Sequence, residues 1–109
     1  MSATPRAVLH RLHQAMNRHD LDAFVACFAP DAHVHDESRD YRGHDEIRSW
    51  KQGTMEKYTY TIEPLKLTRQ GEQRVTLEAK LAGNFPGSPV TLRFAFTLAA
   101  DGIAALEIG

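Results

Sequence analysis

The feature that most constrains the fold of this chain is a strict alternation of apolar and polar side chains over residues 90–98. Every second position is Val, Leu or Phe, and the positions between them carry Thr, Arg or Ala. Successive side chains of a β-strand point to opposite faces of a sheet, so this pattern predicts a strand with one buried face. Residues 75–81 repeat the alternation, and the turn-forming sequence NFPGSP separates the two segments. Together they predict an antiparallel pair with one face toward a core.

The β pattern extends over the second half of the chain. Residues 58–62 also alternate, but the apolar phase moves by one position across Glu63-Pro64 before Leu65 and Leu67. A shift of one position in a period of two indicates a bulge or bend, and proline at that point supports it. After the sequence ADG, residues 103–108 are expected to form the last strand.

The first half of the chain begins with helical patterns. Residues 4–17 carry an apolar stripe at helical spacing, with Thr4 as the cap. Asp20 can cap a second, shorter helix, whose apolar face would run to Phe28 before the sequence AP ends it.

A mixed segment joins these helices to the strands. The sequence AHVHD, residues 32–36, predicts a short strand, and ESRDYRG, residues 37–43, predicts a turn. Residues 44–51 predict a third helix, with Ile47 and Trp50 as its inward anchors. Helices first and antiparallel strands afterwards predict an α+β fold, in which three N-terminal helices pack on one face of a bent sheet.

Composition is that of an ordinary globular protein. The chain has 109 residues, 42% apolar and 25% charged, which suits a single domain over residues 1–109 with a core of its own. A formal charge of −1 without a basic stripe argues against a nucleic-acid partner. The sequence has neither the apolar run of a membrane span nor that of a signal peptide. Because the single cysteine, Cys27, cannot form an internal disulfide, we expect a cytoplasmic protein.

Two stretches of the sequence carry a family resemblance. They are NRHDLDAFVACFAPDAHVHD and YRGHDEIRSW, and a four-strand β tail follows them. With these motifs the chain resembles, over nearly its whole length, the SnoaL-like branch of the NTF2-like superfamily. That group includes ketosteroid isomerases, polyketide cyclases and limonene-epoxide hydrolases. The resemblance implies a cone-shaped fold, in which a strongly curved sheet wraps the helices and an apolar cavity opens between them. Such motifs define a fold better than an activity.

The implied cavity would bind a hydrophobic small molecule, and no cofactor is expected. The helical stripes need a partner surface, which the apolar face of residues 90–98 can supply. Alternatively, the same side chains fill a closed core. The side chains expected to contact a ligand are Leu12, Met16, Phe24, Phe28, Tyr41, Trp50, Tyr58, Tyr60, Phe94 and Phe96.

Asp36 is the leading catalytic candidate. In isomerase-like relatives a carboxylate at the end of the first strand is the proton-shuttling base, and the resemblance places Asp36 there. A carboxylate beside apolar walls is partly desolvated, which raises its pKa toward the range of a general base. Alternatively, Asp36 caps the following turn in solvent.

Two further residues are candidates for catalysis. His35 could orient Asp36 or relay a proton to it if the strand end is irregular. Glu107 interrupts an apolar run, and cyclase-like relatives place a working acid in or near the last strands. An exposed strand edge is the alternative place for Glu107.

The sequence departs from the isomerases in their oxyanion hole, which pairs a tyrosine on the first helix with a protonated acid on a late strand. The matching positions fall at Leu12 and at Leu92 or Arg93, which cannot supply that pair. Steroid isomerisation is therefore not expected, and an enolate would need other donors. The available phenol and indole groups are Tyr41, Tyr58, Tyr60 and Trp50.

His33 and His35 form an H-x-H pair whose side chains would share one strand face, a spacing that can chelate a metal. A third ligand could come from His44 or Asp45 only if the loop folds back. If Asp36 faces the cavity, alternation directs both histidines away from it. We therefore expect no metal.

Two functions remain open: an acid–base enzyme of isomerase, cyclase or hydrolase type, or a non-catalytic ligand-binding or dimerisation module. Relatives commonly dimerise through the outer face of the sheet, so we expect a homodimer, in which Arg93 could meet Glu78 of the partner. A monomer with a solvated sheet is the alternative. The outer face would consist of Thr76, Glu78, Lys80, Thr91, Arg93, Ala95 and Thr97.

Overall fold

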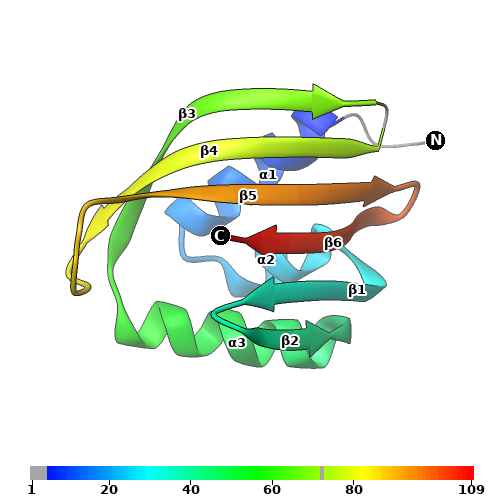
Figure 1. Ribbon diagram of the computed structural model, residues 1–109. Coiled ribbons are helices and arrows are strands. Elements are labelled where there is room, and N and C mark those ends of the chain that lie inside the picture. Colours follow the sequence, from blue (N-terminus) through cyan, green and yellow to red (C-terminus); the bar gives the residue numbers. More distant parts are fainter. Residues whose placement is uncertain (1–4, 72) are drawn as a thin grey trace.

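The computed structural model describes residues 5–71 and 73–109, and within these ranges the chain forms three helices and six strands. The Thr4 cap lies outside the described residues. The predicted α+β class is confirmed, because the helices come first and pack on one side of a curved sheet (Figure 1). The elements are α1 (Pro5–Asn17), α2 (Leu21–Ala26), β1 (Phe28–Asp36), β2 (Arg39–Arg42), α3 (Gly43–Lys57), β3 (Tyr60–Gln70), β4 (Arg74–Gly83), β5 (Val90–Ala99) and β6 (Gly102–Ile108).

The strands lie in one sheet in the order β2-β1-β6-β5-β4-β3. The last four strands form the predicted antiparallel meander. The pair β1 and β6 is parallel, which joins the β1–β2 hairpin to the meander. A register shift between Pro64 and Lys66 places an irregularity in β3 where the apolar phase moves.

Three local predictions differ from the structure. The second helix ends at Ala26, and Phe28 begins β1 because it pairs with Ile103 of β6. The segment predicted as a turn contains strand β2, since Glu37 and Ser38 turn the chain by themselves with φ angles of 52° and 65°. The third helix runs on to Lys57, beyond the predicted residue 51.

The core lies between the concave face of the sheet and the helices. Along β5 the alternation is as predicted, because Phe94, Phe96 and Leu98 are buried while Thr91 and Arg93 are exposed. No helix within the described ranges is long and apolar enough to cross a membrane. The fully buried large side chains are Phe24, Phe28, Ile47, Ile103, Val8, Val34 and Val75.

Candidate functional site

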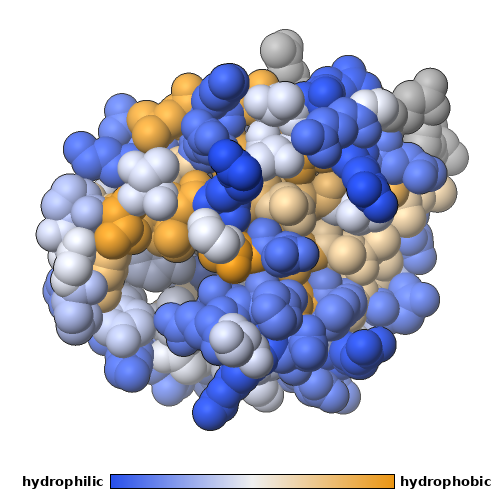
Figure 2. All heavy atoms as spheres, viewed as in Figure 1, coloured by the Kyte–Doolittle hydropathy of each residue, from blue (hydrophilic) through white to orange (hydrophobic). Residues whose placement is uncertain are grey.

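A cavity of about 1590 Å³ lies between the helices and the concave face of the sheet. Its lining is mainly apolar and aromatic, and it comes from all three helices and from every strand of the sheet. Figure 2 shows the molecule hollowed on the side where the connection between β4 and β5 passes above α3. Phe85 and Pro86 of that connection belong to the lining. A concave apolar space with a few polar groups is the usual form of a small-molecule site.

With one exception, the side chains expected to contact a ligand line this cavity. The exception is Phe28, which is only 1% exposed and lies in the closed core. Its ring packs on that of Phe24, with centroids 5.2 Å apart, so Phe24 separates it from the cavity. The expected side chains that do line the cavity are Leu12, Met16, Phe24, Tyr41, Trp50, Tyr58, Tyr60, Phe94 and Phe96.

Asp36, the last residue of β1, lines the cavity and is half-buried. Trp50 Nε1 of α3 donates a hydrogen bond to Asp36 Oδ2 over 3.3 Å, which orients the carboxylate. Burial raises the pKa of Asp36, and the hydrogen bond from Trp50 opposes part of that effect. Strand alternation explains this orientation, because Val34, two residues earlier, is fully buried on the same side.

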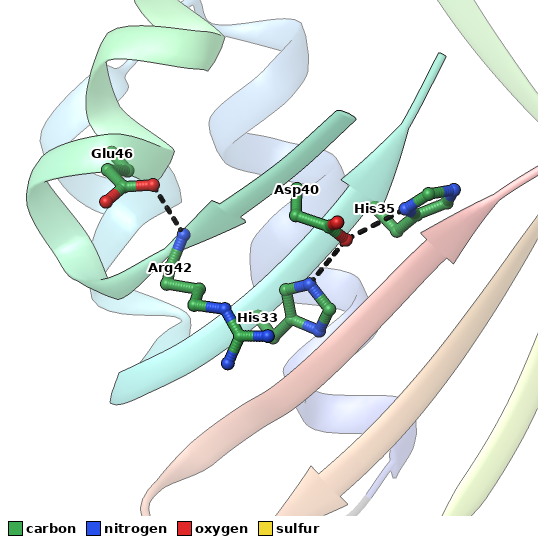
Figure 3. A network of polar contacts seen from close by, with 5 residues as sticks. All are labelled: His33, His35, Asp40, Arg42 and Glu46. Carbon is green, nitrogen blue, oxygen red and sulfur yellow. Dashed lines mark hydrogen bonds and ion pairs between the residues drawn. The ribbon is translucent and has the colours of Figure 1, made fainter. Parts of the chain in front are cut away.

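His35 lies on the opposite face of β1 and does not line the cavity. Its Nδ1 and the Nε2 of His33 both contact Asp40 Oδ1 of β2, at 2.9 Å and 2.7 Å (Figure 3). The hydrogen bond to Asp40 raises the pKa of His35. The predicted proton relay through His35 therefore lacks the geometry it needs, because the strand end remains regular.

The outer cluster of His33, His35 and Asp40 also bears on metal binding. Arg42 and Glu46 lie beside it in Figure 3, where Glu46 Oε1 accepts a hydrogen bond from the Arg42 backbone over 3.0 Å. Among residues 5–71 and 73–109, no group of three or more His, Cys, Asp or Glu side chains is arranged to hold a metal ion.

Glu107 lies outside the cavity as well. Its side chain is exposed on the outer face of β6, where Glu107 stands opposite Ala95 of β5. The neighbouring residues Leu106 and Ile108 point inward and line the cavity. A role for Glu107 as a cavity acid would require the opposite register of β6, and the structure places its side chain in the exposed position that was the alternative.

Lys51, which no sequence motif singled out, is the most deeply buried charged side chain among the described residues, at 3% exposure. It follows Ile47 by four residues, so both occupy the inward face of α3. Its Nζ donates a hydrogen bond to the Tyr60 hydroxyl over 2.6 Å and lies 5.0 Å from the ring centre of Phe24. The spacing of four residues from Ile47 could have revealed the burial of Lys51, because a side chain at that position continues the buried stripe of the helix.

Burial changes the titration of both partners in the Lys51–Tyr60 hydrogen bond. It lowers the pKa of Lys51 to about 8, although the Asp36 carboxylate favours the charged amine. It also raises the pKa of Tyr60 to about 12, and the charge of Asp36 adds to this effect. Asp36, Lys51 and Tyr60 therefore form one electrostatically coupled group on the cavity wall, contributed by β1, α3 and β3.

The SnoaL-like domain family matches residues 9–104 of this sequence. The chain belongs to the SnoaL-like family. A candidate polyketide cyclase of Sinorhizobium meliloti shares 38% sequence identity with this SnoaL-like protein. The alignment covers 94% of this chain and 93% of the other, with a TM-score of 0.89. The comparison with functionally curated proteins gives no significant match.

Two more distant structures share the fold of this SnoaL-like protein. A ketosteroid isomerase-like protein of Catenulispora acidiphila, solved with trimethylamine, is 21% identical, with a TM-score of 0.82 over 98% of this chain and 86% of its own. The epoxide hydrolase/cyclase-like enzyme SalBIII, which has a role in pyran ring formation in the polyether salinomycin, is 19% identical. Its TM-score is 0.82, and the alignment covers 94% of this chain and 87% of SalBIII.

This SnoaL-like protein gathers its cavity donors away from the positions of the isomerase oxyanion pair. Leu12 and Leu92 line the cavity as apolar residues, and Arg93 is exposed on the outer face. The donors Trp50, Lys51 and Tyr60 instead lie around Asp36. The departure seen in the sequence is thus matched in the structure by a different set of polar groups.

Proposed function

We propose that this SnoaL-like protein binds an apolar small molecule in the cavity and that Asp36 acts on it as a general base. The reaction would be an acid–base step of isomerase, cyclase or hydrolase type. The observation that carries the proposal is the position of Asp36, a half-buried carboxylate on an apolar cavity wall with a raised pKa. Partial desolvation makes a carboxylate a stronger base toward a bound substrate.

Tyr60 supplies the complementary acid. Its hydroxyl oxygen accepts the hydrogen bond from Lys51, which leaves the hydroxyl proton available to an oxygen atom of the substrate. With a pKa of about 12, Tyr60 keeps this proton at neutral pH. A donor held in place before the reaction stabilises negative charge as it develops on such an oxygen. The likeness to the candidate polyketide cyclase of Sinorhizobium meliloti supports an acid–base reaction of this kind.

A probe reaction tests Asp36 without knowledge of the natural substrate. The apolar aromatic 5-nitrobenzisoxazole opens to a coloured phenolate when a base removes its ring C–H proton. We expect the protein to accelerate this reaction, and Asp36→Asn to lower the rate about 100-fold, the scale of general-base catalysis. The wild-type rate should rise with pH through the raised pKa of Asp36, because only the carboxylate form is basic.

Asp31→Asn is the matched control for this experiment, because Asp31 is an exposed aspartate of the same strand and does not line the cavity. Its rate should stay close to that of the wild type. Binding of the neutral fluorophore Nile red should be equal in all three proteins. If the wild type reacts no faster than Asp36→Asn while both proteins still bind Nile red, the role of Asp36 as a base is refuted. The protein would then be a binding module without base catalysis.

We also propose that the protein is a homodimer through the outer face of the sheet. This face is polar at its rim, and its centre carries small side chains, among them Ala95 and Thr97, which are half-buried. Arg93 and Glu78 are cross-strand neighbours in one chain, with Nη2 and Oε1 3.3 Å apart, so an Arg93–Glu78 pair between copies would have to replace this contact. An exposed pair of this kind contributes little to stability.

Ala95→Arg should convert the dimer to a monomer, because it places a long charged side chain at the centre of the proposed contact. Within its own chain the new arginine would stand opposite Glu107, so the fold should tolerate it. Sedimentation velocity at micromolar concentration measures the change. Gln52→Arg, on the exposed face of α3, is the control and should remain dimeric. A wild-type protein that sediments as a 12.2 kDa species would refute the dimer.

We propose a cytoplasmic location for the protein. The thiol of Cys27 is buried, and burial raises its pKa, so it is held in the protonated form that resists oxidation. A buried thiol in its reduced form is typical of proteins in a reducing compartment.

A further inference from the structure

The amine of Lys51 has a setting that the proposed base reaction does not use. Three aromatic rings surround its Nζ, with centroids 5.0 Å away for Phe24, 5.7 Å for Trp50 and 5.2 Å for Tyr60. Within the described ranges, the Tyr60 hydroxyl is the hydrogen-bond acceptor found for this amine, and none of the ion pairs includes Lys51. Burying an ammonium ion without a paired anion is costly, and although the rings attract a cation, burial raises the fraction of the amine that is neutral.

The same amine lies on the wall of the cavity beside a carboxylate. Lys51 and Asp36 both line the cavity, and the charge of Asp36 acts on the amine. A neutral amine in an apolar pocket is a nucleophile toward carbonyl carbons. A nearby carboxyl group can carry the protons that such an addition requires.

We propose that Lys51 forms a covalent imine with apolar aldehydes or ketones bound in the cavity. The proposal goes beyond the role of Asp36 as a base toward a substrate C–H group, and it uses Asp36 only to carry protons between nitrogen and oxygen. Apolar carbonyl compounds are favoured as ligands because the cavity wall is mainly aliphatic and aromatic.

The chemistry needs the amine, the carbonyl compound and the Asp36 carboxylate, which first takes one proton from the Lys51 ammonium and so leaves the amine neutral. The nitrogen lone pair attacks the carbonyl carbon, the C=O π electrons move to oxygen, and one proton passes from nitrogen to oxygen to give a carbinolamine. The carbinolamine then loses its hydroxyl group as water, with a proton supplied by the Asp36 carboxyl, and the nitrogen lone pair forms the C=N bond. Nitrogen releases its second proton to restore the Asp36 carboxyl.

Reductive trapping tests the proposal directly. The protein is incubated with 2-naphthaldehyde and sodium cyanoborohydride, which reduces an imine to a stable amine, and the modified lysine is located by peptide mass spectrometry. At pH 7 about a tenth of an amine with a pKa near 8 is neutral, against fewer than about one in a thousand for an ordinary lysine. We therefore expect at least about tenfold more adduct at Lys51 than at Lys66 or Lys80.

Exposed lysines of the same chain serve as internal controls. Lys66 and Lys80 lie on strands of the sheet, are exposed and do not line the cavity. Glyceraldehyde, which is polar, should modify these exposed amines and lose the preference for Lys51. Lys51→Met should abolish the preferred naphthyl adduct while Nile red binding persists.

The result that overturns the proposal is a naphthyl adduct confined to exposed lysines, with Lys51 unmodified. This outcome is distinct from failure of the base proposal. Trapping reports on the Lys51 amine alone, whereas the opening of 5-nitrobenzisoxazole reports on Asp36. An adduct at Lys51 in a protein without base activity would support the imine and refute only the role of Asp36 as a base toward a substrate C–H group.

Discussion

Replacing Lys51 with methionine should remove a stability increase that the wild-type protein shows between pH 7 and pH 10. In the wild type the pKa of Lys51 is lowered from 10.5 to about 8 by burial. Each pKa unit corresponds to about 1.4 kcal/mol, so burying this amine costs about 3 kcal/mol at pH 7. Because Lys51 is only 3% exposed, solvent does little to screen this cost.

The direction of the effect follows from proton binding. Between about pH 8 and pH 10.5 the unfolded chain holds the Lys51 proton while the folded protein has released it. Stability rises with pH wherever the unfolded state binds more protons. The free energy of unfolding of the wild type should therefore rise by about 2 kcal/mol relative to that of Lys51→Met from pH 7 to pH 10.

Urea unfolding at a series of pH values measures both free energies. The series should end near pH 10, because the pKa of Tyr60, raised to about 12, makes stability fall at higher pH. Lys57→Met, which replaces an exposed lysine of the same helix, is the control and should keep the wild-type pH dependence. Parallel curves for the wild type and Lys51→Met would show that the amine is not desolvated, and would remove a premise of the imine proposal.

Phe24→Ala should destabilise the protein by about 4 kcal/mol, within the range for a buried phenylalanine. Phe24 is 1% exposed and contacts Phe28 and Trp50, with centroids 5.2 Å and 6.1 Å away. Removing its ring opens a void at the junction of core and cavity. A loss of this size is a large share of the free energy of unfolding of a typical domain, which is roughly 5 to 15 kcal/mol.

Denaturant unfolding followed by circular dichroism measures this change. Phe85→Ala is the matched control, because Phe85 is a half-buried aromatic residue of the cavity wall, outside the core. It packs edge-on against Tyr58 and Tyr60, with centroids 6.2 Å and 6.3 Å away, and its loss should cost about 1 kcal/mol. Equal losses for the two variants would contradict the assignment of Phe24 to the core.

The sequence alone predicted the fold class and, for most elements, which face points inward. The alternation along residues 90–98 and 75–81 correctly predicted which side chains of β4 and β5 point to the core. The phase shift at Glu63-Pro64 correctly predicted the irregularity in β3. These features depend on local periodicity, which the backbone geometry of a strand or helix translates directly into faces. The family resemblance implied a cavity position for Asp36, and in the structure Asp36 lies on the same inward side of β1 as Val34.

Only the tertiary structure decided which inward positions face a cavity and which face a closed core. Phe28 and Phe24 share the apolar pattern, but the parallel pairing of β1 with β6 draws Phe28 into the core. The register of β6 places Glu107 outside, and a regular end to β1 keeps His35 beside Asp40. Lys51 acquires its properties from groups on other elements, namely Phe24, Tyr60 and Asp36. Desolvation depends on what the rest of the chain places around a group, and no local pattern contains that information.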